Sequence, residues 1–254
     1  MMRNTFLLLL VIPLFAAAQR DSIISGVYPW KEPVMNIQEN LSTVLFEGPT
    51  YDMAYLQVST NSVTGYSKLS GLVPMPEEQL LIIRKGTVTM VLKDSIHIIG
   101  AGSAAVILPG DTYTIQSYNR DSCWFYLVKY RSKTPVNKAR GKTAGGSFVI
   151  DWDKTDSIPN NKGSRRNFFE RSTAMCKRLE MHVSTLNADS SNHGPQMHRA
   201  AELTIMKEGI GELQVGPYYQ ELAAGNVAYL SVNRLQALTN VGFKDCTYYV
   251  IQFE

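Results

Sequence analysis

Hydrophobic and polar residues alternate along most of the chain, in short runs that turn residues separate. A period of two residues is typical of β-strands, because successive side chains of a strand point to opposite faces of its sheet. Markers such as Lys85-Gly86 and Pro109-Gly110-Asp111 end the runs, and no segment carries the long apolar stripe of an amphipathic helix. Many short strands with frequent turns predict an all-β sandwich or barrel. We expect strands at residues 51–58, 87–92, 104–108, 124–130, 178–186, 203–207, 211–215, 227–230 and 247–253.

The second half of the chain repeats the first at a constant offset of 123 positions. The aligned pairs are Gly86 with Gly209, Gly102 with Gly225, and Cys123 with Cys246. The residues around these pairs are similar in type in the two halves, as residues 122–128 (SCWFYLV) and 245–251 (DCTYYVI) show. A solenoid would repeat every ~20–50 residues, whereas one repeat over half the chain indicates two copies of one domain.

The first 18 residues have the composition of a secretory signal peptide. Arg3 supplies a positive charge, residues 6–15 are apolar, and Ala16-Ala17-Ala18 offers small residues at the cleavage point. The apolar run is too short to span a bilayer stably, and no cysteine near the cleavage point could carry a lipid. We therefore expect an exported protein, periplasmic or extracellular, with no stable membrane insertion after cleavage.

The mature chain is expected to form two barrels joined by a polar segment. Residues 133–146 are polar, rich in glycine and without a hydrophobic pattern, which predicts an interdomain linker at residues 133–150. We expect an N-terminal barrel at residues 19–132 and a C-terminal barrel at residues 151–254. A polar loop at residues 153–166 is expected to cross the face of the second barrel.

Charge and cysteine content exclude two classes of site. The formal net charge is only +3 and the basic residues are dispersed, so we expect no nucleic-acid partner. The three cysteines show no Cys-x-x-Cys spacing, which excludes zinc held by thiolates. We expect buried free thiols, because a disulfide between Cys123 and Cys246 would require two equivalent strands to lie side by side.

Four polar residues of the second half have the spacing of a metal site. Gln196 and His198 are two positions apart, so both point to one face of a strand, and Glu202 and Gln236 would join them from neighbouring strands. Burying four polar groups in one barrel without a shared partner is costly. One imidazole, one carboxylate and two amides suit one Mn²⁺ or Fe²⁺ per chain better than Zn²⁺. The alternative is a histidine that is only a hydrogen-bonded core residue, since neutral amides are weak ligands.

The pattern Gln-x-His-x3-Glu-x6-Gly at residues 196–209, followed by Gly-x10-Gln-x3-Asn at residues 225–240, resembles the two motifs of the cupin superfamily. Gln196 and Gln236 stand where the superfamily has histidines. The resemblance implies two tandem cupin barrels, each a double-stranded β-helix or jelly roll. The offset places these residues of the first repeat at the four ligand positions: Val73, Met75, Gln79 and Tyr113. Three of these have little or no ability to bind a hard cation, so we expect the first barrel to be structural.

A metal site in the second barrel alone, with a glutamine as its last ligand, resembles (S)-ureidoglycine aminohydrolase. That family reads Glu-x-His-x3-His and then Gln, at the spacing found here. The resemblance implies a metal-dependent hydrolase that cleaves a C–N bond of a small polar substrate and releases ammonia. It implies that the cation is held by Gln196, His198, Glu202 and Gln236.

The same resemblance implies the roles of residues beside the metal. Glu202 would move a proton for the attacking water, and Tyr248 would orient the substrate, with Gln236 and Gln252 beside it. Gln252 stands where the family has a lysine, and Leu213 where it has a tyrosine. The loss of that lysine disfavours a carboxylate-bearing substrate, because a cation normally neutralises such a charge.

Other functions stay open at the level of sequence. A non-catalytic bicupin could bind a sugar or an organic acid in the second barrel. A metal-dependent dioxygenase or isomerase follows only by analogy with the fold. Paired barrels often associate through edge strands, so a homo-oligomer is also expected by analogy.

Overall fold

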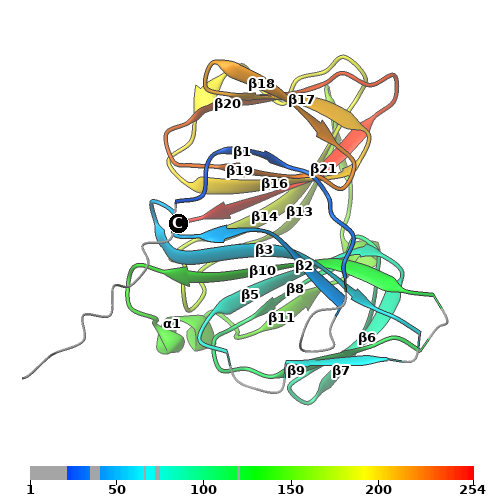
Figure 1. Cartoon of the computed structure of the whole chain (residues 1–254), viewed down its shortest axis with the longest axis vertical. Coiled ribbons are helices and arrows are strands. Elements are labelled where there is room, and N and C mark those ends of the chain that lie inside the picture. The colour runs from blue at the N-terminus through cyan, green and yellow to red at the C-terminus, as the bar shows by residue number, and fades with distance from the viewer. Residues whose placement is uncertain (1–21, 35–40, 66, 72–74, 119–120) are drawn as a thin grey trace, which may run out of the picture.

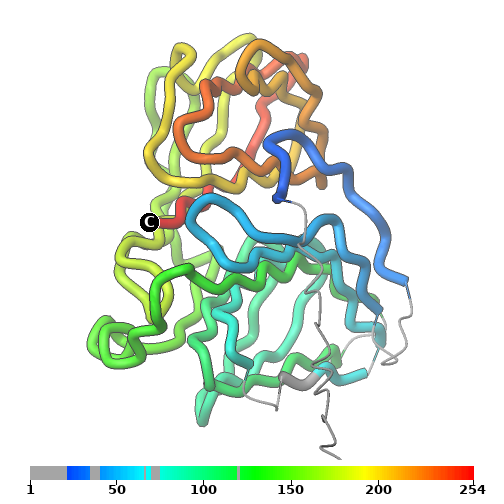
Figure 2. Tube along the Cα trace, turned by 60° about the vertical axis from the view of Figure 1, so that its left-hand side comes forward, coloured from blue at the N-terminus to red at the C-terminus, as the bar shows by residue number. Residues whose placement is uncertain are grey.

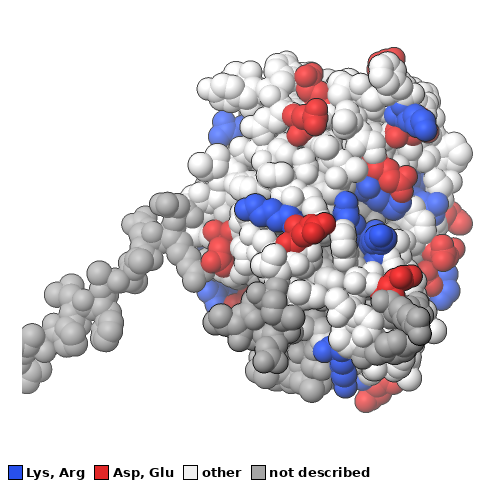
Figure 3. Space-filling view, turned by 45° about the vertical axis from the view of Figure 1, so that its right-hand side comes forward, with Lys and Arg blue, Asp and Glu red and all other residues white. Residues whose placement is uncertain are grey.

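The computed structural model of the protein describes residues 22–34, 41–65, 67–71, 75–118 and 121–254. The expected signal peptide lies outside these residues. Strands dominate the structure, and four antiparallel sheets stack as four layers, two for each barrel (Figure 1). Among the described residues, no helix is both long and apolar enough to cross a membrane. On the face that Figure 3 displays, acidic and basic side chains are interspersed.

The first barrel has a four-stranded outer sheet and a six-stranded inner sheet that faces the second barrel. The outer sheet has the order β4 (Lys68–Gly71), β9 (Tyr113–Gln116), β6 (Thr87–Leu92) and β7 (Ser95–Gly100). The inner sheet has the order β11 (Phe148–Ile150), β8 (Ala104–Ile107), β5 (Glu78–Lys85), β10 (Cys123–Ser132), β3 (Met53–Val63) and β2 (Leu41–Gly48).

The second barrel has a seven-stranded inner sheet and a four-stranded outer sheet. The inner sheet has the order β1 (Gly26–Tyr28), β19 (Val227–Leu230), β16 (Ala201–Glu208), β21 (Cys246–Phe253), β14 (Leu179–Leu186), β13 (Gly163–Arg171) and β12 (Ile158–Asn160). The outer sheet has the order β15 (Gln196–Met197), β20 (Leu235–Asn240), β17 (Ile210–Val215) and β18 (Tyr218–Ala223).

Every strand that the alternation predicted is present, so hydrophobic periodicity located them correctly. The prediction of a loop at residues 153–166 is wrong in part. It contains a short 3₁₀ turn, η1 (Trp152–Lys154), followed by the antiparallel pair β12 and β13. Strand β13 has no fully buried residue, and its mixture of charged and aromatic side chains gives no clear two-residue alternation. The polar residues at the start of β13 therefore have the composition of a loop.

The two barrels exchange strands across the boundaries that the polar segment predicted at residues 133–150. Strand β1 pairs with β19 of the second barrel, and β11 pairs with β8 of the first. Figure 2 shows the N-terminal segment following the second barrel before the chain enters the first. Residues 133–150, expected to be only a linker, contain helix α1 (Lys138–Thr143) as well as β11. The second barrel is therefore completed by β1, which precedes the first barrel in the sequence. The first barrel is completed by β11, which precedes the strands of the second barrel.

An apolar middle layer lies between the two inner sheets. Side chains of β5, β8 and β10 pack there against those of β14, β16 and β21. Tyr130 and Phe253 meet edge to face across the layer, with ring centroids 5.0 Å apart. The middle layer joins both barrels into one core, whereas the interior of each barrel holds a smaller apolar cluster of its own.

Strand alternation divides the residues of β16 and β21 between two environments. Leu203 and Ile205 of β16 belong to the middle layer, and Met206 belongs to the cluster inside the second barrel. Glu202 and Thr204 alternate with Leu203 and Ile205 along the strand, so they face the same interior as Met206. The packing of the middle layer thus determines which polar side chains enter the second barrel.

All three cysteines are buried free thiols, as expected. Cys123 lies in β10 and Cys246 in β21, and these strands belong to different sheets. Burial raises the pKa of the Cys123 thiol to about 12 and that of Cys246 to about 11. Such thiols are protonated at neutral pH and behave as small apolar residues.

Glu78 on β5 is fully buried and ties the first barrel to the second. The Tyr130 hydroxyl donates to Oε1 of Glu78, and the backbone N–H of Met175 donates to Oε2 at 3.1 Å. Met175 belongs to the segment that leads into β14, so the carboxyl bridges the two barrels. Burial raises the pKa of Glu78, although hydrogen bonds from Thr173, Tyr130 and Met175 oppose the shift.

We predict that Glu78 makes the stability of the fold depend on pH. Because the folded chain binds this proton more tightly, its contribution is fully present below the ordinary value of 4.5 and is lost as pH rises through the folded pKa. Glu78→Gln, which cannot titrate, should therefore lose less free energy of unfolding between about pH 4 and pH 8, by on the order of 1 kcal/mol. Urea unfolding at three pH values measures this, with Glu221→Gln as the exposed control. Identical pH slopes for the wild type and Glu78→Gln would contradict the prediction.

Candidate functional site

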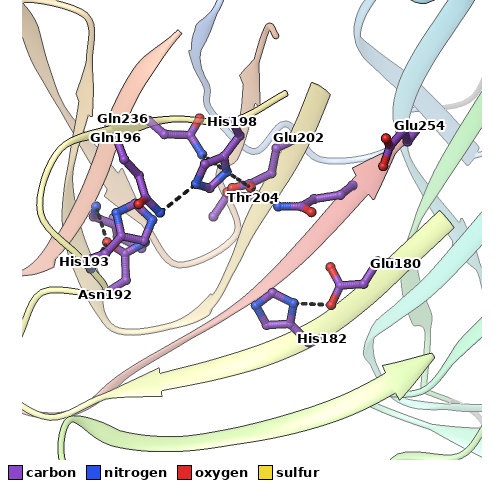
Figure 4. A network of polar contacts seen from close by, with 12 residues as sticks. Glu180, His182, Asn192, His193, Gln196, His198, Glu202, Thr204, Gln236 and Glu254 are labelled. Atoms are coloured by element: carbon purple, nitrogen blue, oxygen red, sulfur yellow. Dashed lines mark hydrogen bonds and ion pairs between the residues drawn. The ribbon is translucent and has the colours of Figure 1, made fainter. Parts of the chain in front are cut away.

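A cavity of about 440 Å³ opens into the second barrel. Its walls come from β13, β14, β16, β21 and the loop before β15, which bring together polar side chains from distant parts of the chain. They include Arg165, His182, His198, Glu202, Tyr248 and Gln252. Figure 4 shows His182, His198 and Glu202 among the polar side chains of this region. A larger hollow of about 700 Å³ lies beside β7 and β11, but it is lined by none of the motif residues.

The other three predicted ligands converge on His198. Gln196 on β15 lies directly opposite Gln236 on β20. The Gln196 amide nitrogen lies 3.0 Å from Nε2 of His198, and the Gln236 amide nitrogen lies 2.9 Å from its Nδ1. Oε2 of Glu202, on β16, lies 3.1 Å from the same Nδ1. The spacing in the sequence therefore identified a real spatial cluster, which Figure 4 shows at one end of the polar network.

Glu202 is a buried carboxylate with three side-chain partners. Thr204 Oγ1 donates to Oε1 at 3.0 Å, and Gln252 Nε2 donates to Oε2 at 3.0 Å. Burial alone would raise the pKa of Glu202, but the hydrogen bonds from His198, Gln252 and Thr204 outweigh burial and lower it. The hydrogen bond to Glu202 in turn raises the pKa of His198, against the opposing effect of burial. Each group thus favours the charged form of the other.

The residues expected beside the substrate have different surroundings. Tyr248 is buried on the cavity wall, which Ser184 and Asn192 also line. Burial raises the pKa of Tyr248, so it stays a neutral phenol. Gln252 donates to Glu202, and its Oε1 accepts from Nη1 of Arg178 at 3.2 Å. Gln252 is thus held between two charged groups and supports Glu202.

A second charged cluster, which sequence reasoning missed, borders the same cavity through Arg165 and His182. Nδ1 of His182 lies 2.6 Å from Oε1 of Glu180, and Nη2 of Arg165 lies 3.1 Å from the same oxygen. Glu180, His182 and Ser184 are polar at every second position of β14, while Leu179, Met181 and Val183 join the middle layer. This alternation was a visible signal that β14 presents a polar face to the barrel interior.

The first barrel is different at the equivalent positions. The Tyr113 hydroxyl donates to Oε1 of Gln79 at 3.0 Å, and both residues are buried. Val73, the equivalent of Gln196, lies outside the described residues. An apolar cluster that includes Leu81, Ile83 and Phe125 fills the interior around this pair. These two polar residues satisfy each other and leave no charge inside the described part of the first barrel.

The donor set around His198 fits a divalent cation in its chemistry. A carboxylate and two amides that can turn their oxygens inward already lie within hydrogen-bonding distance of the His198 imidazole. Among the described residues, no group of three or more His, Cys, Asp or Glu side chains is placed to hold a metal ion. A cation would therefore depend on the amides of Gln196 and Gln236, which favours Mn²⁺ or Fe²⁺ over Zn²⁺.

Comparison with known proteins shows the fold. No protein-family model and no curated protein matches the sequence. Oxalate decarboxylase from Lactobacillus farciminis, solved as a formate complex, is similar over 93% of this chain and 88% of its own, with a TM-score of 0.68 and 11% identity. The protein Ylba from E. coli, of the family DUF861, matches over 78% of this chain and 77% of its own, with a TM-score of 0.62 and 15% identity.

A third solved structure has the same architecture. The cupin 2 conserved barrel domain protein from Leptotrichia buccalis covers 87% of this chain and 92% of its own, with a TM-score of 0.55 and 13% identity. Identities this low establish the fold alone. The chain is an all-β protein of two tandem cupin barrels, as the sequence motifs predicted.

We predict that Glu202 sets the proton affinity of His198. Glu202→Gln removes the hydrogen bond that is the largest cause of the raised pKa, together with the charge beside the ring. Burial remains and favours the neutral ring, so the pKa of His198 should fall. An NMR titration of the imidazole signals in metal-free protein measures this change, with Glu221→Gln as the control. An unchanged His198 titration in Glu202→Gln would show that the pair does not form.

Proposed function

We propose that the second barrel is the active site of a metal-dependent hydrolase that cleaves a C–N bond of a small polar substrate and releases ammonia. The observation that carries this proposal is the convergence of Gln196, Glu202 and Gln236 on His198 at the cavity. The sequence resemblance to (S)-ureidoglycine aminohydrolase supplies the reaction type, and cupin-fold neighbours include enzymes. Export, proposed from residues 1–18, would place this reaction outside the cytoplasm.

The cavity supports a substrate that carries an anionic group. Lys162 lines the cavity, with Nζ donating to the carbonyl of Asn192 at 3.0 Å. This cation takes the place of the lysine that Gln252 replaces. A carboxylate would therefore find a positive charge at the cavity wall, although not at the position expected from the resemblance.

In this reaction a water oxygen forms a bond to the carbon that carries the amino group, and the C–N bond breaks. A bound Mn²⁺ or Fe²⁺ supplies Lewis-acid chemistry, and Gln196, His198, Glu202 and Gln236 would hold it. Tyr248, a neutral phenol on the cavity wall, orients the substrate through its hydroxyl. The water loses one proton, and the departing nitrogen gains one. The products are therefore ammonia and a molecule that carries a hydroxyl group on that carbon.

A non-catalytic binding protein is the second candidate, and one observation favours it. Both oxygens of Glu202 and both nitrogens of His198 have polar side-chain partners within the protein. The cluster is thus satisfied without a cation, as in a binding cavity for a small sugar or organic acid. Metal content separates the two candidates. Association of two copies stays a prediction.

We predict that mature protein purified without chelator carries about one Mn²⁺ or Fe²⁺ per chain, since one donor set is present. His198→Ala removes the central ligand and should lose the metal. His97→Ala, in the first barrel, is the matched control and should keep it. Elemental analysis by mass spectrometry measures all three proteins, and ammonia release from ureidoglycine then tests the reaction. A wild type that stays metal-free after reconstitution would favour the binding protein.

A further inference from the structure

His182 is a buried imidazole in the cavity that the metal motif does not use. It lies on β14, which forms the wall beside β21, whereas His198 follows β15. Both histidines line the same cavity, and Figure 4 shows them as separate parts of the polar network. His182 is 9% exposed, so its ring is held by the protein and still borders the cavity.

Glu180 determines which nitrogen of His182 carries the proton. A carboxylate accepts hydrogen bonds, and Oε1 of Glu180 lies 2.6 Å from Nδ1. In the neutral ring the hydrogen is therefore on Nδ1, and Nε2 keeps its lone pair. No hydrogen bond to Nε2 of His182 is found within the described part of the chain. This nitrogen is available to a molecule in the cavity.

Arg165 balances the charge of Glu180. Its Nη2 lies 3.1 Å from the same carboxylate oxygen, and Glu180 is buried. The guanidinium and the carboxylate together form a neutral pair, so the neighbouring imidazole does not have to be protonated to compensate a buried negative charge. Asn167 further fixes the guanidinium by accepting from Nε at 2.7 Å. The cluster therefore holds the imidazole in one orientation.

The other carboxylate of the cavity is less suited to receive a proton. Both oxygens of Glu202 are already engaged, because Oε1 accepts from Thr204, and Oε2 accepts from Gln252 and lies 3.1 Å from Nδ1 of His198. Register places Gln252 between Glu202 and Glu180 on adjacent strands, so the two carboxylates belong to separate clusters. The resemblance to the aminohydrolases assigned proton transfer to Glu202, but the geometry of the cavity favours His182.

We propose that His182 is the catalytic base of the second barrel and that Glu180 and Arg165 are its positioning residues. This inference rests on the proposed hydrolase function. Nε2 of His182 takes a proton from the attacking water as the oxygen bonds to the substrate carbon. The same nitrogen returns that proton to the departing amine as the C–N bond breaks. The ring is neutral before and after the step, so no other reactant is needed.

The orientation of His182 can be measured independently of activity. The chain has four histidines, so each imidazole can be assigned in ¹⁵N NMR spectra with single substitutions. Mature full-length protein purified with Mg²⁺ avoids paramagnetic broadening. We expect His182 with the hydrogen on Nδ1 and a bare Nε2, and we expect Glu180→Ala to abolish this preference. A hydrogen on Nε2 in the wild type would overturn the proposed role of Glu180.

Activity tests the base itself. His182→Gln should reduce ammonia release by about 10²–10⁴-fold while leaving metal content and the thermal unfolding midpoint close to wild type. Glu180→Ala should reduce kcat less, with KM little changed, and His97→Gln is the matched control. Turnover by His182→Gln within about threefold of wild type would overturn the base and leave the hydrolase proposal standing. Absence of turnover in metal-loaded wild type would overturn both, whatever the NMR spectra show.

Discussion

The packing of the two inner sheets against each other is the constraint on which the rest of the structure depends. Because side chains alternate along a strand, each residue buried in the middle layer commits its neighbour to a barrel interior. Tyr249, Ile251 and Phe253 of β21 fill the middle layer, and this places Tyr248 and Gln252 at the cavity. A slip of one residue would bury Gln252 in the apolar layer, so the core also fixes the site.

The interior of the second barrel tolerates two carboxylates because each has charged or polar partners. Glu202 is paired with His198, and Glu180 contacts both Arg165 and His182. An isolated buried charge would be costly, whereas paired groups with hydrogen bonds lose less on burial. These networks hold the side chains in single orientations. They therefore fix the positions of the donor groups around His198 and the orientation of the His182 ring.

One architecture carries two different interiors. At the positions equivalent to Glu202 and Gln236, the first barrel has Gln79 and Tyr113, which bond to each other among apolar side chains. Its inner sheet instead supplies half of the middle layer and the buried carboxyl of Glu78. The first barrel thus provides the support against which β14, β16 and β21 of the second barrel pack.

The sequence by itself determined the strands, the repeat and the three residues around His198, because alternation and ligand spacing are local properties of a strand. It did not reveal the exchange of β1 and β11, since pairing between distant segments leaves no periodic signal. Only the tertiary structure decided that Arg165 and His182 both contact Glu180, and that Gln252 donates a hydrogen bond to Glu202. These contacts join residues on different strands, and their geometry depends on strand register, which no short motif encodes.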